Sequence, residues 1–183
     1  MNTPRQQNGF TLIEMVVSLG LFTIIMFIAT SAFLSIVNTD RKSRAVRIAA
    51  DNLNIALEDM SRRIKTGSTY YCGGGIGSIG NLDCGAGSTS IAFTDQFGVT
   101  RISYRLNNNA IERQMTGEAG YATVTSPEIR ITGLKFVVSG SAPFPGNTQQ
   151  PIVVVAIGGS LGTGTASSTF IIQTTITQRA YDN

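Results

Sequence analysis

The chain of 183 residues contains no histidine and no tryptophan, and it has only two cysteines. Without imidazole groups it can form no Ser-His-Asp triad, no Cys-His pair and no histidine general base. Two thiols cannot complete a tetrahedral zinc site without histidine ligands. These absences exclude many catalytic classes, and we therefore expect a protein that is not an enzyme and has no cofactor or bound metal.

Charged residues are also scarce, at 14% of the chain, and the net charge of +3 is unevenly spread. Residues 1–37 contain only Arg5 and Glu14, residues 38–66 contain seven basic and four acidic side chains, and residues 67–183 contain six of each. The basic excess is therefore local. A low charge content beside 42% hydrophobic residues indicates a folded chain with a membrane-buried piece.

Residues 15–37 form an apolar segment of 23 residues without a charge or a proline. As a helix this segment would measure roughly 35 Å, which is enough to cross a bilayer. We expect its Ser and Thr hydroxyls to bond backbone carbonyls. A cleaved secretory signal is the alternative, but the segment is longer than the apolar part of a signal peptide and Glu14 stands at its beginning.

Glu14 is the most informative residue of the N-terminal region. A carboxylate at the start of an apolar helix costs a few kcal/mol to bury unless a cation neutralises it. Cleavage after Gly9 would give Phe10 a free amine four residues before Glu14. That amine could offset the carboxylate in its own helix or in a neighbouring one, so the charge predicts assembly.

The sequence GFTLIEMVVS at residues 9–18 resembles the N-terminal motif of type IV pilins and type II secretion pseudopilins. The resemblance implies that prepilin peptidase cuts between Gly9 and Phe10 and that the Phe10 amine becomes methylated. It implies that Glu14 pairs with the amine of a neighbouring subunit. It also implies that the partners are other pilin or pseudopilin subunits, the peptidase and an assembly platform in the inner membrane.

Two features depart from the family pattern. Family leaders often place Lys or Arg directly before the glycine, whereas residues 6–8 here are Gln-Gln-Asn. Many major pilins have a proline at the position of Ser31. The basic residues at positions 41, 42, 44 and 47 follow the apolar segment, and the positive-inside tendency would place them in the cytoplasm. The family topology implies the opposite orientation, with the head outside the cytoplasm.

An amphipathic helix is predicted after the apolar segment. Its apolar face advances by three or four residues, as in an α-helix, and comprises Val46, Ala49, Leu53, Leu57, Met60 and Ile64. Its polar face contains the pairs Arg47–Asp51 and Glu58–Arg62, each four residues apart. Since no proline interrupts residues 10–66 and Gly67 can end a helix, we expect one helix of about 55 residues, roughly 80 Å long.

Short β-like runs separated by turn residues follow Gly67 and predict a mostly antiparallel sheet, so the fold class is α+β. The predicted strands are residues 89–94, 99–106, 110–115, 128–138, 152–157 and 169–178. Asn107, Asn108 and Asn109 tolerate positive φ and predict a hairpin over residues 99–115. Residues 152–157 are apolar throughout and predict a central strand.

Cys72 and Cys84 flank a glycine-rich loop without apolar periodicity. A structural disulfide is the simplest interpretation, and it would suit a head outside the cytoplasm. Two independent buried thiols remain the alternative.

The glycine-rich pieces at 73–80 and 158–164 lack the phosphate-loop pattern and are expected to be loops. Calcium is poorly supported because Glu128 and Asp182 are the only acids after residue 118. Phe144, in the turn at 143–146, is expected to plug the core.

The sequence therefore predicts four parts: a leader at 1–9, a transmembrane or filament-core helix at 10–37, an amphipathic helix at 38–66 and a β-rich head at 67–183. We expect a single-pass inner-membrane protein whose head lies outside the cytoplasm and which assembles into a pilus or pseudopilus. Residues 102–106, 111–113 and 57–64 weakly resemble J/W-type minor pilins, so a minor subunit is expected.

Two alternatives remain open. The first is a single-pass anchored binding or adhesion protein. The second is a DNA-uptake pilin that binds nucleic acid through its basic cluster, Arg41, Lys42, Arg44 and Arg47. No aromatic residue lies among these side chains to stack on bases, and acids do.

Overall fold

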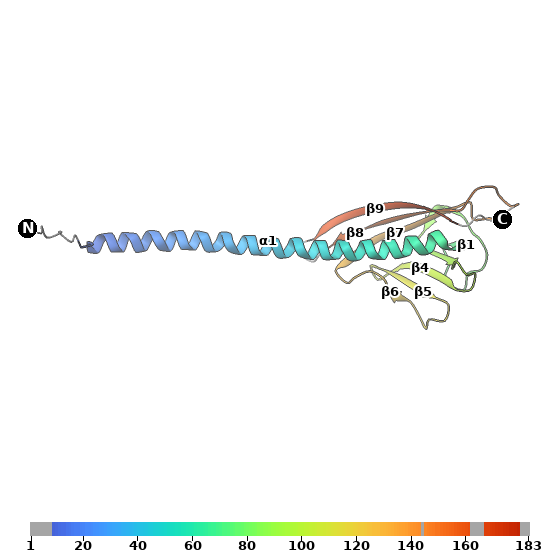
Figure 1. Ribbon diagram of the computed structural model, residues 1–183, viewed down its shortest axis with the longest axis horizontal. Coiled ribbons are helices and arrows are strands. Elements are labelled where there is room, and N and C mark those ends of the chain that lie inside the picture. The colour runs from blue at the N-terminus through green and yellow to red at the C-terminus, as the bar shows by residue number, and fades with distance from the viewer. Residues whose placement is uncertain (1–8, 144, 162–166, 180–183) are drawn as a thin grey trace, which may run out of the picture. The chain divides into compact units, whose positions relative to one another are not determined.

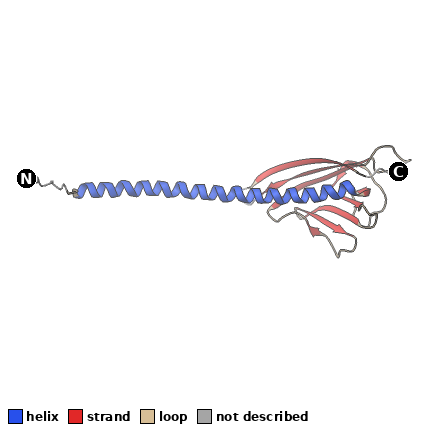
Figure 2. Ribbon diagram, viewed as in Figure 1, coloured by secondary structure: helices blue, strands red, loops and turns tan. Residues whose placement is uncertain are grey.

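The computed structural model describes residues 9–143, 145–161 and 167–179, and these form one helix and nine strands. Helix α1 covers Leu12–Thr66, a length of 55 residues, as the unbroken pattern of the sequence predicts. The chain divides into two compact units, Met1–Ser43 and Arg44–Asn183. Figure 1 shows by its colours that every strand follows the helix in the chain, and Figure 2 distinguishes the one helix from the strands.

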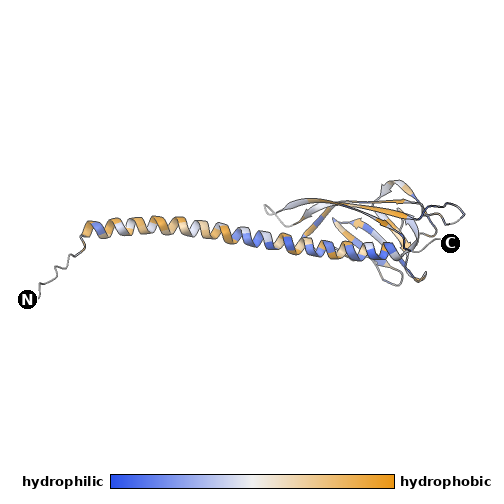
Figure 3. Cartoon of the chain, turned by 45° about the horizontal axis from the view of Figure 1, so that its top comes forward, coloured by the Kyte–Doolittle hydropathy of each residue, from blue (hydrophilic) through white to orange (hydrophobic). Residues whose placement is uncertain are grey.

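The first unit contains the apolar part of α1, which Figure 3 colours as mostly hydrophobic residues. Three of its hydroxyl side chains bond carbonyls of the preceding turn, as expected. Thr23 Oγ1 donates to the Gly20 carbonyl, Thr30 Oγ1 to the Met26 carbonyl, and Ser31 Oγ to the Ile28 carbonyl, each at 2.8 Å. These bonds let polar residues lie in an apolar helix without leaving a hydroxyl unpaired.

The second unit places the rest of α1 against two antiparallel sheets, where the sequence suggested one. The five-stranded sheet has the order β1 (Ser68–Cys72), β3 (Ser90–Thr94), β4 (Arg101–Asn107), β5 (Ala110–Met115) and β6 (Ala122–Thr123). The four-stranded sheet has the order β2 (Cys84–Ser88), β7 (Ile129–Ser139), β8 (Ile152–Leu161) and β9 (Ser168–Thr177). The α+β class is confirmed.

The predicted apolar face of α1 is the face that packs on the sheets. Its buried side chains are Ala49, Leu53, Ala56, Met60 and Ile64, while Val46 and Leu57 are partly buried. Opposite them, the rings of Tyr70, Phe93 and Tyr104 follow one another at 6.1 and 6.2 Å between centroids. A helix with one apolar stripe thus closes a single core shared by both sheets.

The end of α1 is fixed by three contacts. The Gly67 amide donates to the Ile64 carbonyl at 3.1 Å, and the Tyr70 hydroxyl donates to the same carbonyl at 2.7 Å. The Arg179 amide donates to the Lys65 carbonyl at 2.8 Å. The Ile64 and Lys65 carbonyls, which have no partner within the helix, are therefore satisfied by residues that follow it.

Several strand predictions are confirmed and others are wrong. The β4–β5 hairpin turns at Asn108 and Asn109, whose φ angles are 47° and 60°, and β8 lies between β7 and β9 as expected for a central strand. However, β4 starts at Arg101 rather than at residue 99. Residues 158–161 belong to β8 rather than to a loop. Strands β1, β2 and β6 were not predicted.

The remaining expectations fall on residues that the structure does not describe. Phe144 and Asp182 lie outside the described residues, as do positions 162–164 of the second glycine-rich piece.

Candidate functional site

The N-terminal motif lies at the point where the helix begins. Thr11 precedes the first helical residue, and its Oγ1 accepts a hydrogen bond from the Glu14 amide at 3.4 Å. The same hydroxyl donates to Glu14 Oε2 at 3.5 Å, and the Met15 amide donates to the Thr11 carbonyl at 3.2 Å. Thr11 is therefore the N-cap of α1, and Glu14 occupies the third helical position, where a carboxylate is favoured by the helix dipole.

Thr11 is a site residue that our reading of the sequence missed. The signal was present, because Thr-x-x-Glu before an apolar run is the pattern of a capping box. The helix consequently begins at Leu12 and leaves the two residues before Thr11 outside it.

Gly9 and Phe10 precede the helix and are exposed. The Phe10 side chain is 80% exposed, and a Cβ placed on Gly9 would meet no atom within 4 Å. The peptide bond between these residues is therefore outside regular secondary structure and lies between two exposed residues.

The apolar part of α1 is exposed on every side within its unit. None of the residues from Gly9 to Ile36 is buried, and the helix is long and apolar enough to cross a membrane. Such a surface is far larger than the apolar patches that monomeric soluble proteins leave in water. It requires a lipid environment or other helices to cover it.

The head carries the disulfide between Cys72 and Cys84, whose Cα atoms lie 5.9 Å apart. Cys72 is the last residue of β1 and Cys84 the first of β2, so the bond connects the two sheets. Beside it, the Cys72 amide donates to the Leu82 carbonyl at 3.0 Å and the Leu82 amide donates to the Tyr70 carbonyl at 2.9 Å. The glycine-rich loop is thus closed at its base.

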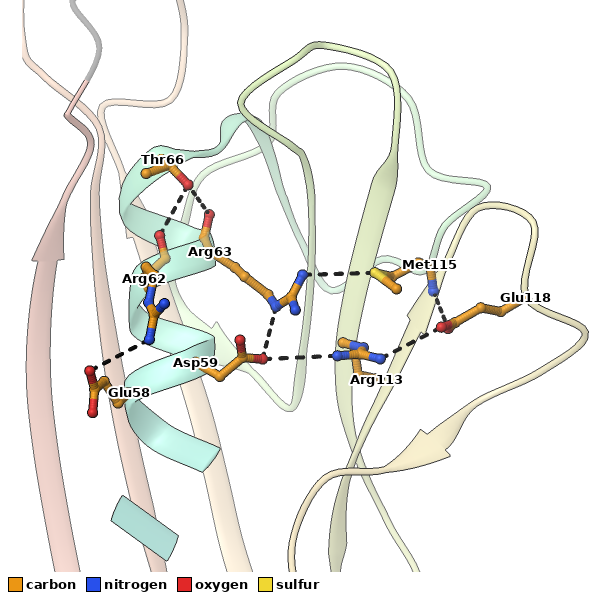
Figure 4. A network of polar contacts seen from close by, with 8 residues as sticks. All are labelled: Glu58, Asp59, Arg62, Arg63, Thr66, Arg113, Met115 and Glu118. Carbon is orange, nitrogen blue, oxygen red and sulfur yellow. Dashed lines mark hydrogen bonds and ion pairs between the residues drawn. The ribbon is translucent and has the colours of Figure 1, made fainter. Parts of the chain in front are cut away.

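A polar network connects α1 to the five-stranded sheet, as Figure 4 shows. Arg63 Nε donates to Asp59 Oδ2 at 2.8 Å, and Arg113 Nη1 of β5 lies 3.9 Å from the same oxygen. Arg113 Nη2 lies 3.6 Å from Glu118 Oε1, and Glu118 Oε2 accepts the Met115 amide at 2.8 Å. The hydrogen bond from Arg63 to Asp59 outweighs partial burial and raises the pKa of Arg63.

The role of this network is to hold parts of the head together. Opposite charges alternate along it, and its side chains are partly exposed, so each pair contributes modestly to stability. It attaches the turn after β5 to the helix. Among the residues that the structure describes, no group of three or more Cys, Asp and Glu side chains is placed to share a metal ion.

The comparison with known families finds one match. The model of the prokaryotic N-terminal methylation motif matches residues 4–30, which include Gly9, Phe10, Thr11 and Glu14. This motif is the signature of type IV pilins and pseudopilins. No curated protein and no solved structure matches the chain.

Proposed function

From the motif at its N-terminus, we propose that this chain is a minor subunit of a type IV pilus or a type II secretion pseudopilus. Prepilin peptidase cuts between Gly9 and Phe10, the new Phe10 amine is methylated, and the chain is assembled through α1. Before assembly α1 anchors the chain in the inner membrane, with the head of residues 67–183 outside the cytoplasm. The chain serves as a structural subunit rather than as a catalyst.

One observation carries this proposal: a single carboxylate, Glu14, stands at the start of a helix surface that is otherwise apolar and exposed. The capping bonds to Thr11 satisfy the Glu14 backbone amide and one carboxylate oxygen, but no cation among the residues that the structure describes pairs with its negative charge. In lipid or among apolar helices, such a charge is costly. A cation supplied by a neighbouring subunit would remove that cost and fix the neighbour's axial position.

The cleavage itself supplies the cation. After removal of residues 1–9, the α-amine of Phe10 lies directly before the N-cap, at the positive end of the helix dipole. A positive charge is disfavoured there unless a carboxylate is near. An amine on one chain and Glu14 on the next would therefore stabilise each other.

The head fits this role in two ways. The Cys72–Cys84 disulfide is of a kind that persists in oxidising compartments, which supports a location outside the cytoplasm. All the buried core side chains lie between Ala49 and Ile176, so the head keeps its own core while the apolar helix changes its surroundings. The helix can thus move from lipid into a bundle without unfolding the head.

Two variants test the proposal against a purely local role of Glu14. Glu14→Gln removes the charge and keeps a side chain that can cap, whereas Thr11→Val removes the capping hydroxyl and keeps the charge. We expect Glu14→Gln to reduce filaments at least tenfold, and Thr11→Val to leave them largely intact. Glu58→Gln removes an equal charge from an exposed position of the second unit and serves as the matched control.

Filaments are counted in the native host, and mass spectrometry of the mature chain is done in parallel. We expect a start at N-methyl-Phe10. A mature chain that still begins at Met1, together with a normal number of filaments in Glu14→Gln, would identify an anchored binding protein instead. Normal filaments in Glu14→Gln, together with a loss of filaments in Thr11→Val, would mean that Glu14 acts only through the cap.

A further inference from the structure

The two sheets of the head end in four edges, and three of these are protected. Strand β6 has only two residues. Strands β1 and β2 have five residues each, and both pairings contain a register shift. Short, irregular edge strands are the means by which proteins prevent unwanted pairing with other chains.

The fourth edge, β9, has none of these protections. It pairs with β8 over ten consecutive residue pairs without a register shift. Its sequence, STFIIQTTIT, contains no charge, no proline and no glycine. Among the strands that the structure describes, β9 pairs with β8 alone, so its outer backbone groups face away from the sheet. A long, regular and uncharged edge of this kind is suited to accept another strand.

The burial of β9 supports an open edge. On the inward face, Phe170 and Ile172 are only partly buried, whereas Val153 and Val155 of the adjacent strand β8 are each 1% exposed. On the outward face, Ile171 is 88% exposed. An extra strand beside β9 would cover side chains of both faces, as β9 itself does for β8.

We propose that β9 binds an extended, uncharged segment of a neighbouring pilin-type subunit, which adds a fifth strand to the four-stranded sheet. This inference rests on the proposed function, because assembly through α1 holds the heads of neighbouring subunits close together. Backbone hydrogen bonds provide the affinity. Because β9 itself is uncharged, a charged segment would lose hydration there without gaining an ionic partner, so the pairing selects an uncharged segment rich in β-branched residues.

Antiparallel pairing between the β9 strands of two copies is disfavoured by the course of the helix. The end of β9 lies beside the end of α1, where the Arg179 amide bonds the Lys65 carbonyl. Antiparallel pairing of two β9 strands would therefore make the helices of the two copies run in opposite directions within their heads. Neighbouring heads whose helices run in the same direction cannot adopt that arrangement.

Site-specific photo-cross-linking in cells tests the proposal on the full chain. The photoreactive amino acid p-benzoylphenylalanine replaces Gln173, which is exposed near the middle of β9, and in a control chain it replaces Ser139, which is exposed on β7. We expect Gln173 to give at least five times more cross-linked product than Ser139. Mass spectrometry should locate the attachment in an extended segment of another pilin-type subunit.

A pair of charge variants provides a second readout. Gln173→Lys places a protecting charge at the edge, and Ser139→Lys places the same charge on β7, two strands away from it. We expect Gln173→Lys to reduce filaments at least fivefold and Ser139→Lys to leave them unchanged. The thermal midpoint of both purified variants should stay within about 2 °C of wild type, which excludes a folding defect.

The proposal is overturned if position 173 gives no more product than position 139, if it attaches only to lipid, or if it attaches to β9 of a second copy. These outcomes are separable from failure of the proposed function. A mature chain starting at Phe10 and a loss of filaments in Glu14→Gln, combined with no product from position 173, would retain the pilin-type subunit and reject the β9 pairing alone.

Discussion

Asn109 and Ile131 join the two sheets of the head at one end. The Ile131 amide donates to the Asn109 carbonyl at 2.8 Å, and Asn109 Nδ2 donates to the Ile131 carbonyl at 3.2 Å. Asn109 belongs to the turn of the five-stranded sheet, and Ile131 belongs to β7 of the four-stranded sheet. Because the disulfide connects the sheets between β1 and β2, two separate links hold them together.

The first prediction concerns Asn109 itself. Its φ of 60° lies in the left-handed region, which costs most residues about 1 kcal/mol or more, and its side chain adds a hydrogen bond of roughly 1 kcal/mol. Asn109→Ala should therefore lower the free energy of unfolding by about 2 kcal/mol. Asn109→Gly should lose only about half as much, because glycine keeps the backbone conformation. Urea unfolding measures both.

Equal losses in the two Asn109 variants would contradict the backbone part of this account. No loss in either variant would mean that the link between Asn109 and Ile131 contributes nothing to the stability of the head.

The second prediction concerns the disulfide. Cys72 and Cys84 are 12 positions apart, and their bond restricts the unfolded chain, which is worth roughly 2–4 kcal/mol for loops of this size. The double variant Cys72→Ser, Cys84→Ser should lose about that much stability, measured by urea unfolding. Addition of a reductant should destabilise the wild type by a similar amount and leave the double variant unaffected. Identical unfolding of the oxidised and reduced wild type would refute the prediction.

The third prediction concerns Gly67, where the helix meets the first strand. A Cβ at this position would lie 2.6 Å from Phe93 Cδ2 and 2.9 Å from the Thr94 carbonyl oxygen. Since Phe93 is fully buried and the carbonyl belongs to β3, neither can move freely. Gly67→Ala should destabilise the head by roughly 1–3 kcal/mol through overpacking.

Gly85→Ala is the matched control, because a Cβ there meets nothing within 4 Å. It should be neutral or slightly stabilising, since alanine has less freedom than glycine in the unfolded chain. Stability is measured by thermal unfolding. Similar losses of stability in both variants would show that overpacking against Phe93 and Thr94 does not explain the effect of Gly67→Ala.

The sequence was sufficient to predict the structure wherever a local pattern determined it. The stripe from Val46 to Ile64 has helical spacing, and those residues form the buried or partly buried face of α1. Asn108 and Asn109 tolerate positive φ, and the hairpin turns there. At the N-terminus, the Thr-x-x-Glu pattern contained enough information to place the helix start, although we did not use it.

The sequence was insufficient where the tertiary structure overrides local preference. Gly159 reads as a loop residue, yet it lies in β8 because it pairs with Ile131 of β7 and Phe170 of β9, and a side chain there would collide with the Arg130 carbonyl and the Phe170 ring. Strands β1 and β2 are short and rich in polar residues or glycine, and they form strands through pairing with β3 and β7. The division into two sheets also depends on such long-range pairings, which no local period reveals.

The fourth prediction concerns the pH dependence of the turn between β3 and β4. Burial alone would raise the pKa of Asp95, but hydrogen bonds from the Thr100 and Val99 amides, at 3.1 and 3.0 Å, outweigh burial and lower it. The folded-state pKa is therefore below the unfolded value of about 4. The stability that these bonds provide is fully present above about pH 4 and is lost as the pH falls through the folded-state pKa.

Asp95→Asn should accordingly lower the thermal midpoint at pH 7 and reduce the further drop between about pH 4 and pH 2. The matched control is Phe97→Ala, which changes an exposed side chain of the same turn without altering a titratable group. This variant should keep the pH profile of the wild type. The measurement is the thermal midpoint of the full chain in detergent at a series of pH values. If the thermal midpoints of the wild type and Asp95→Asn fell by the same amount between about pH 4 and pH 2, Asp95 would not contribute to the acid sensitivity of the head.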